Sequence, residues 1–546
     1  MVASTAATAA TDFGRPLGAS ERWFWIIDRI SPANCVGRVR VHGRLTAEEL
    51  SGAAGALVAE YPLLRAGVRD AGNGDPRLFA LADPGIPIRR VLVGGGGGAA
   101  SRNGTVAPGI ASGTAATAEA SVASGTSIAS GAVAGSRVAA ASGAVVSKGG
   151  VAPYAFAETA VVGVEDIASD AVWRREVDAE LAAPFTPERG LARIVDIGYA
   201  AGTPDEYHDV VLTVSHVIMD GRSLLTLLRK LIRFGAESRA GRHAGVGGRG
   251  RAGGTGREGR VGSVGAPMPG TREPIPVADD LIPLGARGFW RYCYTTLSDQ
   301  VMAVALRPRK LVPPVAVGLG ERRTRAVYRT VDAAGLEALT ADCHRAGVTV
   351  HGVLAAAVAR VVGETARPGG GGVAGIGSPV DFRALLEPAP DAEELGIYAP
   401  VLANFVRFGP RESLWAAARA VNRQLERGIR RRKHLSVVAG MRFGTPRTVA
   451  TGRRVVEMVD RRAPWNVSVT NVGRADFPET VGGRRISDVT LAGSNSCVSA
   501  LTVSIISTHG RMRLGFCYVT GILDATSAEA FADRVVAELT GRAAPV

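Results

Sequence analysis

Ser215-His216-Val217-Ile218-Met219-Asp220-Gly221 is the most informative segment of this chain, because it joins a predicted strand to a predicted helix. Residues 209–215 form a short, mainly apolar run that reads as a strand and ends just before His216. Apolar residues at helical spacing follow at once: Leu224, Leu225, Leu227, Leu228, Leu231 and Ile232. We expect this helix to end at Gly235, where a left-handed cap would be natural.

The segment has the pattern HxxxDG, which suits proton abstraction by His216. The unperturbed pKa of histidine lies near neutrality, and a strand end would hold the ring rigidly at a sheet edge. Asp220 is expected to brace the loop through backbone amides or an arginine. Gly221 is expected to supply a backbone angle that few other residues tolerate. A capped turn with a core histidine is the structural alternative for the same pattern.

Strand and helix patterns alternate along the rest of the chain, which predicts mixed α/β sheets covered by helices. Strands are expected at residues 36–43, 193–199, 325–331, 373–380, 401–408, 465–469, 500–508 and 511–519. Further helices are expected at residues 20–30, 46–60, 332–346, 350–364 and 527–539. Two such lobes would leave a cleft between them, which is a common place for a ligand site.

Composition divides the chain into regions. Residues 1–14 are predicted to be a disordered leader, residues 15–236 an N-terminal lobe, and residues 273–546 a C-terminal lobe. Residues 94–150, dominated by Gly, Ala, Ser and Val, are interpreted as a low-complexity insertion, and residues 237–272 as a Gly/Arg-rich linker.

The chain is strongly basic, with a formal net charge of +14 and a pI near 10.1. Seven arginines against two glutamates lie in the Gly/Arg-rich segment, which has no aromatic residues for base stacking. We therefore expect a linker and no nucleic-acid partner there. A second basic run, residues 430–433, would meet phosphates or an acidic carrier protein, or else form a solvated helix end.

Cysteine usage and hydropathy indicate the compartment. The five cysteines are odd in number and lie far apart, with no CxxC pair for a metal or redox centre. No apolar stretch approaches the length of a membrane span. We expect a cytoplasmic protein without a metal, without a transmembrane segment and in monomeric form. Cys343 is interpreted as a buried structural thiol.

At this point the chain resembles the condensation-domain and chloramphenicol-acetyltransferase-like superfamily of CoA- or carrier-dependent acyltransferases. Four further segments look like that family's landmarks, in family order: Arg15-Pro16-Leu17 through Ser20-Glu21, Glu60-Tyr61-Pro62-Leu63-Leu64-Arg65, Asp381-Phe382-Arg383, and Ser468-Val469-Thr470-Asn471-Val472-Gly473. Among subfamilies the chain looks most like polyketide-associated acyltransferases of the phthiocerol/phthiodiolone dimycocerosyl transferase type. The resemblance implies two chloramphenicol-acetyltransferase-like lobes that form a pseudo-dimer with a central cleft or tunnel.

The resemblance also implies the reaction. Acyl-CoA or a phosphopantetheine-linked acyl group would be the donor substrate, a small molecule the acceptor, and no bound cofactor would be needed. Peptide-forming members usually show HHxxxDG and RHPxLR, whereas here Ser215 and the pair Glu60-Tyr61 stand in those places. This departure favours transfer to a hydroxyl or an amine over peptide synthesis. A non-catalytic docking module on the same scaffold is the alternative from another functional class.

Roles for other residues follow by the same resemblance. Arg383 is the first choice to pair with Asp220, and Arg65 the second. Backbone amides beside Gly221, Thr470 and Asn471 are candidate contacts for the oxyanion, and Asn404 is a candidate substrate contact. Each has a plainer alternative: Arg383 as a surface charge after a strand, Asn404 as a polar residue at a ladder end, and Asn471 as a turn former.

Overall fold

The computed structural model describes residues 14–70, 75–94, 156–162, 169–246, 277–313, 315–494 and 496–541. The predicted low-complexity insertion, nearly all of the leader, and the linker from residue 247 onward lie outside the described residues.

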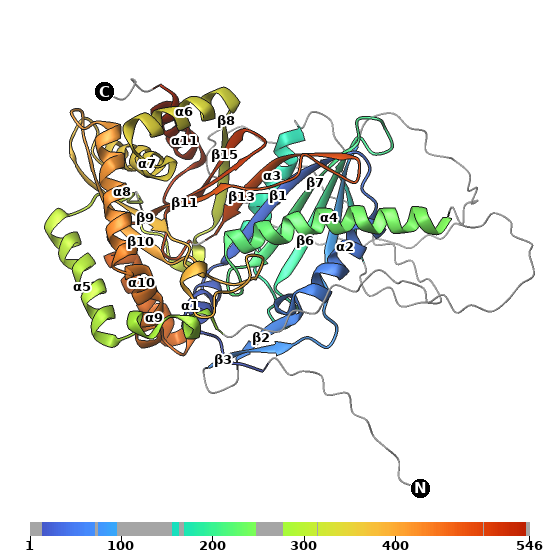
Figure 1. Ribbon diagram of the computed structural model, residues 1–546, viewed down its shortest axis with the longest axis horizontal. Helices are drawn as coiled ribbons and strands as arrows, with labels where there is room; N and C mark the ends of the chain where they lie inside the picture. Colours follow the sequence, from blue (N-terminus) through green and yellow to red (C-terminus); the bar gives the residue numbers. More distant parts are fainter. Residues whose placement is uncertain are drawn as a thin grey trace, which may run out of the picture.

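A seven-stranded mixed sheet forms the first half of the fold, with the strand order β12-β13-β1-β7-β6-β4-β5 (Figure 1). Its strands are β1 (Asn34–His42), β4 (Ile88–Val93), β5 (Phe156–Val162), β6 (Ala192–Tyr199), β7 (Tyr207–Ser215), β12 (Thr480–Val481) and β13 (Arg484–Gly493). Helices α2 (Ala47–Glu60) and α4 (Gly221–Val246) cover one face, where Gly37 of β1 lets Leu224 and Leu228 approach closely. Helix α3 (Ser169–Ala182) covers the other face.

A six-stranded sheet with the order β10-β9-β11-β14-β15-β8 forms the second half. Its strands are β8 (Thr324–Val331), β9 (Gly372–Pro379), β10 (Val401–Phe408), β11 (Val467–Arg474), β14 (Leu501–Thr508) and β15 (Arg511–Val519). The helices packed against it are α6 (Ala333–Ala346), α7 (Val350–Ala366), α8 (Leu414–Arg430) and α11 (Ala525–Thr540). Outside the two sheets lie α1 (Ala19–Asp28), α5 (Phe289–Leu306), α9 (Lys433–Gly444), α10 (Val449–Arg462) and the hairpin of β2 (Ala66–Asp70) and β3 (Pro76–Ala80).

The expected mixed α/β architecture is confirmed. Both sheets combine parallel pairs, such as β4 with β6 and β11 with β14, with antiparallel pairs. Parallel strands need helical crossovers, and these account for the alternation of strand and helix patterns in the sequence.

The two halves exchange a strand. Strand β13 belongs to the first sheet, where it runs antiparallel to β1 with Cys35 opposite Gly493, although its neighbours in the chain, β11 and β14, belong to the second. The predicted boundary at residue 272 does not anticipate this exchange. Because β13 covers an edge of β1 that would otherwise present unpaired backbone groups, the exchange ties the halves together through the ladder itself.

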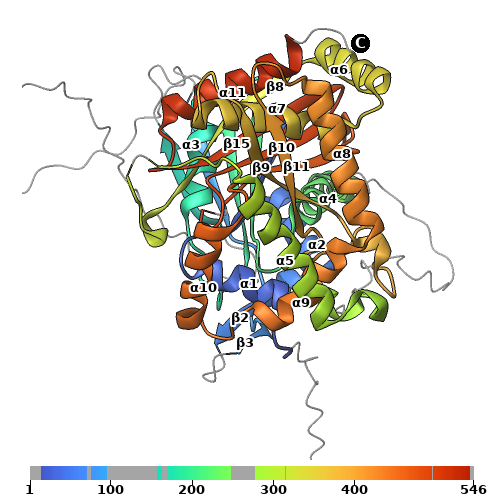
Figure 2. The ribbon, with the colours of Figure 1, turned by 90° about the vertical axis from the view of Figure 1, so that its left-hand side faces the viewer.

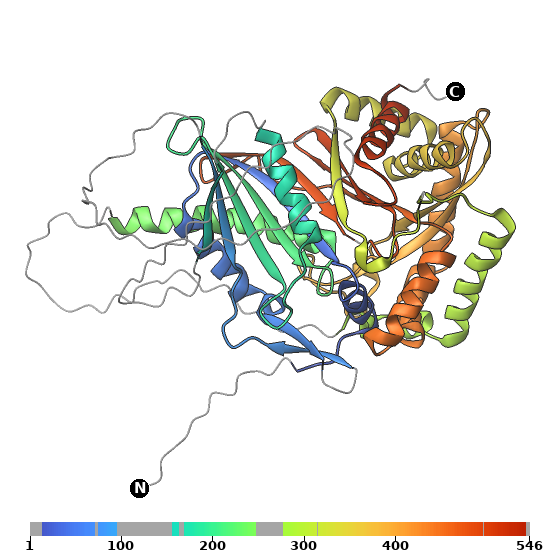
Figure 3. The same ribbon diagram turned by 180° about the vertical axis from the view of Figure 1, so that it is seen from behind.

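An apolar cluster lies between the two sheets and is built around α3, which is the teal helix near the middle of Figure 3. Trp173 of α3 meets Tyr328 of β8 edge to face, with ring centroids 4.8 Å apart. Asp178 of the same helix accepts a hydrogen bond from the Ala326 backbone at 2.9 Å. The helix therefore contacts both sheets and fixes their relative position.

One expectation about an individual element is wrong, and two strand predictions match the structure. Helix α4 does not end at Gly235 but runs on to Val246, ten residues into the predicted linker. Gly235 instead lies inside the helix and faces α2, where a Cβ would lie 4.0 Å from Ala53, an ordinary contact distance. The strands expected at 401–408 and 511–519 coincide with β10 and β15.

Two further findings concern the burial of the cysteines and the absence of a membrane-spanning helix among the described residues. Four of the five cysteines are buried, and Cys343 is among them, which confirms its predicted burial. No single helix in the described ranges is long and apolar enough to cross a membrane. Helices α6 and α7 meet that requirement only as a pair, and the pair is bent by 99°.

Candidate functional site

His216 directly follows β7, at the point where the chain turns toward α4. Its backbone N–H donates to the carbonyl of Ala33 at 2.8 Å, which extends the pairing of β1 with β7 by one bond. Its ring stacks on Phe24 of α1, with centroids 3.9 Å apart and planes inclined by 12°. The strand end and the aromatic ring together fix the orientation of the imidazole.

The imidazole is half-buried, and its two nitrogens differ. Nδ1 is buried and has no hydrogen-bond partner in the described part of the chain, whereas Nε2 is not among the buried unpartnered atoms. Burial lowers the pKa of His216 below its usual 6.5, and the Asp220 carboxylate and nearby backbone carbonyls oppose this only in part. The ring is therefore neutral at pH 7 and able to accept a proton.

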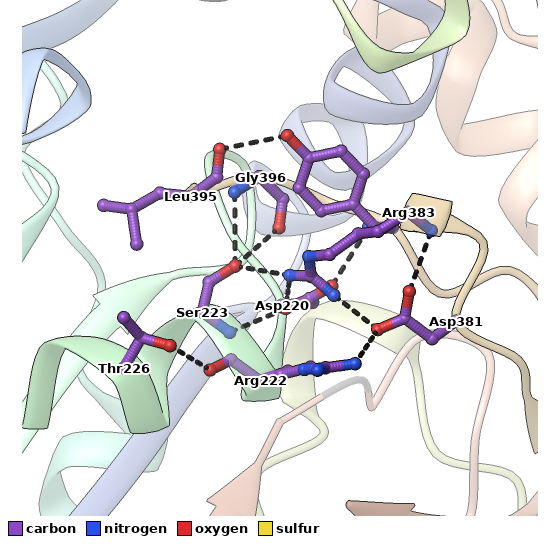
Figure 4. A network of polar contacts seen from close by, with 9 residues as sticks. Asp220, Arg222, Ser223, Thr226, Asp381, Arg383, Leu395 and Gly396 are labelled. Carbon is purple, nitrogen blue, oxygen red and sulfur yellow. Dashed lines mark hydrogen bonds and ion pairs between the residues drawn. The ribbon is translucent and has the colours of Figure 1, made fainter. Parts of the chain in front are cut away.

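Asp220 is 4% exposed, and all of its polar groups are occupied (Figure 4). Its carboxylate accepts from Arg383 Nη2 at 2.9 and 3.1 Å, from the Ser223 backbone at 2.9 Å and from the Tyr398 backbone at 3.0 Å. Its own N–H donates to the Gly396 carbonyl at 2.9 Å. Burial alone would raise the pKa of Asp220, but Arg383 and the two backbone donors outweigh it and hold the pKa below 3.8.

Arg383 joins the Asp220 loop to the second half of the molecule. The ion pair expected between Asp220 and Arg383 is present, and Arg383 is 7% exposed, which excludes its alternative role as a surface charge. Its Nη1 donates to Asp381 at 2.7 Å, and its guanidinium lies 4.2 Å from the centre of the Tyr398 ring. Asp381 also pairs with Arg222 at the start of α4, at 2.9 Å.

Further along α4, a second group of charged residues also links the first half to the second. Lys230, buried on α4, donates to Glu60 and contacts Glu393, both at 2.7 Å. Glu393 also accepts from Arg229 at 3.0 Å. Since Glu60 opens the EYPLLR segment, that landmark is fixed to the helix that begins directly after Asp220. Helix α4 therefore lies at the boundary between the halves and forms ion pairs with residues of both.

The expectation for Gly221 is wrong. Gly221 does not adopt a positive φ, and a Cβ added there would meet no atom within 4 Å. Its N–H has no hydrogen-bond partner among the described residues, as befits the first turn of a helix. The glycine therefore leaves open space beside an unpaired amide, and backbone strain does not explain it.

We accordingly expect Gly221→Ala to leave folding intact. The unfolded chain loses conformational freedom, so the stability should be unchanged or higher by up to about 1 kcal/mol. The substitution places a methyl group in the open space beside the N–H, so any effect on activity should exceed the effect on stability. Chemical denaturation of the variant checks this, and a loss of more than about 1 kcal/mol would contradict the geometry described for Gly221.

The remaining candidates lie on strands of the second sheet. Thr470 and Asn471 are half-buried on β11. The Asn471 Oδ1 accepts from the Gly473 backbone at 2.9 Å and so braces the bulge that follows, as its alternative as a turn former predicted. Asn404 on β10 is 1% exposed, and its Oδ1 is buried without a partner in the described chain. Neither a hydrogen bond nor a ring contact joins these three side chains to His216 in the described part of the chain.

The sequence interpretation missed three members of the site: Phe24, Ser223 and Tyr398. Ser223 had a usable signal, because Asp-x-x-Ser at a helix start is a capping pattern and the Ser223 N–H does bond Asp220. The Phe24 and Tyr398 contacts join residues 192 and 178 positions apart, which no local pattern encodes.

Comparisons with known proteins concern the family and the fold. Residues 321–522 match the family model described as phthiocerol/phthiodiolone dimycocerosyl transferase C-terminus. Across the whole chain, the fold is similar to polyketide synthase associated protein 5 from Mycobacterium tuberculosis, with 13% identity, a TM-score of 0.57 and coverage of 96% of this chain and 98% of that one. No curated protein sequence gives a match.

Two other solved structures share the fold. Trichothecene 15-O-acetyltransferase from Fusarium sporotrichioides is 11% identical, with a TM-score of 0.60 and coverage of 98% of this chain and 97% of that chain. The first condensation domain of the calcium-dependent antibiotic synthetase is 14% identical, with a TM-score of 0.58 and coverage of 96% and 95%. The expected resemblance to the superfamily, near the dimycocerosyl transferase type, is confirmed, and it indicates acyl transfer as the general class of reaction.

Proposed function

We propose that this chain, which has the fold of the condensation-domain and chloramphenicol-acetyltransferase-like superfamily, moves an acyl group from a thioester to a hydroxyl or amine with His216 as general base. The observation that carries the proposal is the state of the His216 ring. It is fixed by Ala33 and Phe24, it has a lowered pKa, and only its Nδ1 is a buried, unpartnered nitrogen. A fixed, neutral imidazole at the end of a strand is able to act as a general base.

In the proposed reaction, Nε2 takes the proton of the acceptor while the acceptor oxygen or nitrogen attacks the thioester carbonyl carbon. The carbon–sulfur bond of the resulting tetrahedral intermediate then breaks, and the departing thiolate receives the proton from the imidazolium. No acyl-enzyme forms. We assign the developing negative charge on the carbonyl oxygen to the unpaired N–H of Gly221 at the start of α4, where the helix dipole also favours an anion.

The other site residues have supporting roles in this proposal. Asp220 and Arg383 hold the loop between His216 and Gly221 in register and do not touch the reacting atoms. Thr470 and Asn404 remain candidate contacts for substrate, while the Oδ1 of Asn471 is engaged by its own bulge. The donor would be acyl-CoA or carrier-bound phosphopantetheine, bound in a cleft or tunnel between the halves. The chain would act as a cytoplasmic monomer and need no bound cofactor.

Activity should rise with pH and then reach a plateau. Because burial lowers the pKa of His216, the base is neutral above that pKa and protonated below it. The acidic limb of kcat/KM should therefore have an apparent pKa below 6.5, with little change between pH 7 and pH 8. Initial rates over the range of pH in which the fold is stable check this, and an acidic limb centred above 6.5 would argue against His216 as the base.

Product analysis tests the function itself. The purified chain is offered a panel of acyl-CoAs and carrier-bound acyl groups together with mixed alcohols and amines, and the products are identified by mass spectrometry. We expect ester or amide products that the His216→Ala variant does not form. Equal product from both proteins would refute the mechanism. The absence of product from both would favour the docking module, and peptide products would favour a condensation domain.

A further inference from the structure

Helix α5 is attached to the protein through one side only. Tyr292 lies against Gly440 of α9, where a Cβ would come within 2.0 Å of its ring. Phe289 meets Phe443 edge to face at 5.4 Å, and Asp299 forms an ion pair with Lys433. These contacts anchor α5 along α9, at the outer left edge of Figure 1 and on the face turned toward the viewer in Figure 2.

The opposite side of α5 is apolar and exposed. The side chains concerned, which we term the α5 apolar face, are Trp290 (81% exposed), Tyr294 (68%), Leu297 (63%), Val301 (57%) and Val304 (75%). Their spacing places them on a single side of the helix. The two charged residues of α5, Arg291 and Asp299, lie outside this arc. At 1.5 Å per residue, the 18 residues give a helix about 27 Å long.

Cations border the α5 apolar face. A hollow of about 850 Å³ beside α5 is lined by Trp290, Tyr294 and Met302 on one side and by Arg427 and Arg431 on the other. Asp299 is the carboxylate in its lining, and Lys433 neutralises it. Arg430 and Arg432, also exposed, extend the positive charge around the end of α8. This cluster contains the basic run of residues 430–433 for which the sequence left several interpretations open.

We propose that the α5 apolar face and the adjoining arginines form a docking surface for an anionic lipid bilayer. A helix lying in the plane of a membrane buries its apolar side at the boundary of headgroups and acyl chains, while flanking cations contact the phosphates. Tryptophan and tyrosine are the side chains that favour this boundary, because an apolar ring carries a polar group at one end. The net charge of +14 adds a general attraction to an anionic surface.

The arrangement favours a bilayer over a protein partner. The α5 apolar face is continuous along one side of the helix, and its five members are exposed apolar or aromatic side chains with no buried polar group among them for a partner to recognise. The arginines lie in one cluster beside the α5 apolar face, where they could contact the phosphates of neighbouring lipids at the same time. Since neither feature involves His216, the docking surface does not depend on the proposed catalytic role.

Co-sedimentation with vesicles tests the proposal. The full-length protein is mixed with vesicles of phosphatidylglycerol and phosphatidylcholine in equal parts, or of phosphatidylcholine alone. We expect binding to the anionic vesicles that weakens at high salt. The variant Trp290→Ser/Leu297→Ser/Val301→Ser should bind about 100-fold more weakly, because three apolar side chains no longer enter the bilayer. The variant Arg427→Gln/Arg430→Gln/Arg431→Gln should show a loss of similar size, since each arginine near the surface contributes about fivefold.

Matched variants exclude trivial causes. Arg367→Gln/Arg411→Gln/Arg534→Gln removes the same net charge from exposed arginines outside the docking surface and should bind as the wild type does. Trp290→Phe keeps the face apolar and should retain binding, as should His216→Ala. The proposal is overturned if the α5 variant binds like the wild type, or if both arginine variants weaken binding equally. It is also overturned if the wild type binds no vesicles. One such outcome is a wild-type dimer that the α5 substitutions convert to a monomer, which would show that a second copy of the chain covers the α5 apolar face.

Discussion

Replacement of His216 by alanine should lower kcat/KM by about a hundredfold to ten thousandfold, because proton transfer by a positioned base contributes factors of this order. The fold should remain, since the buried Nδ1 of the imidazole has no hydrogen-bond partner in the described chain. The ring does stack on Phe24, so some stability is lost with it. Steady-state rates with the donor and acceptor found by product analysis provide the measurement.

The control for this variant is His344→Ala. His344 is exposed on α6 in the second half, and the same substitution there should leave kcat/KM unchanged. His216→Gln is also informative, because glutamine keeps a polar side chain of similar reach but cannot serve as a base. A His216→Gln enzyme with wild-type kcat would show that the ring binds substrate without taking a proton.

The largest effect on stability is expected from Arg383→Ala. The substitution leaves the Asp220 carboxylate buried and deprived of its cation, which typically costs about 3–5 kcal/mol. Loss of the bonds from Arg383 to Asp381 and Ser223 adds to this. Chemical denaturation gives the free energy of unfolding, and kcat should fall with it because the His216–Gly221 loop loses its support.

Two controls separate the buried pair from ordinary surface charges. Arg222→Ala removes an ion pair with Asp381 in which the arginine is 58% exposed, and such pairs contribute about 0–1 kcal/mol. The double variant Asp220→Ala/Arg383→Ala removes both charges and should cost less than the sum of the two single variants. Additive costs would show that Asp220 and Arg383 do not stabilise one another.

The same pair predicts a direction for pH dependence. The folded-state pKa of Asp220 lies below its unfolded value of about 3.9, so its contribution is complete above that pH and is lost as the pH falls through the folded pKa. The stability difference between the wild type and Asp220→Asn should therefore shrink below about pH 4. A difference that grows on acidification would contradict the lowered pKa.

The sequence predicted those parts of the fold that depend on local patterns. Strands β10 and β15 have the expected bounds because alternation and turn residues mark both ends. Gly235 was misjudged, because a glycine at a helix–helix contact looks the same in sequence as a glycine at a helix end. The place of β13 in the first sheet was not predictable, since pairing between residues 35 and 493 leaves no local trace.

The candidate site was likewise predictable in part. His216 and its place after β7 followed from the strand pattern, and the pairing of Asp220 with Arg383 followed from family resemblance. The roles of Tyr398 and Phe24 depend on contacts between residues far apart in the sequence, and only the folded structure shows them. Gly221 shows the limit of reasoning from residue type, because its φ is ordinary and the space beside it is open.

The most direct test is a crystal structure of the protein with a non-hydrolysable thioether analogue of its donor and with the acceptor bound. We predict that the acceptor's hydroxyl or amine lies within about 3.2 Å of the imidazole Nε2 at position 216. The carbonyl oxygen of the analogue should point at the N–H of residue 221. Ligands bound elsewhere, with no path from the surface to that imidazole, would contradict the proposed role of His216.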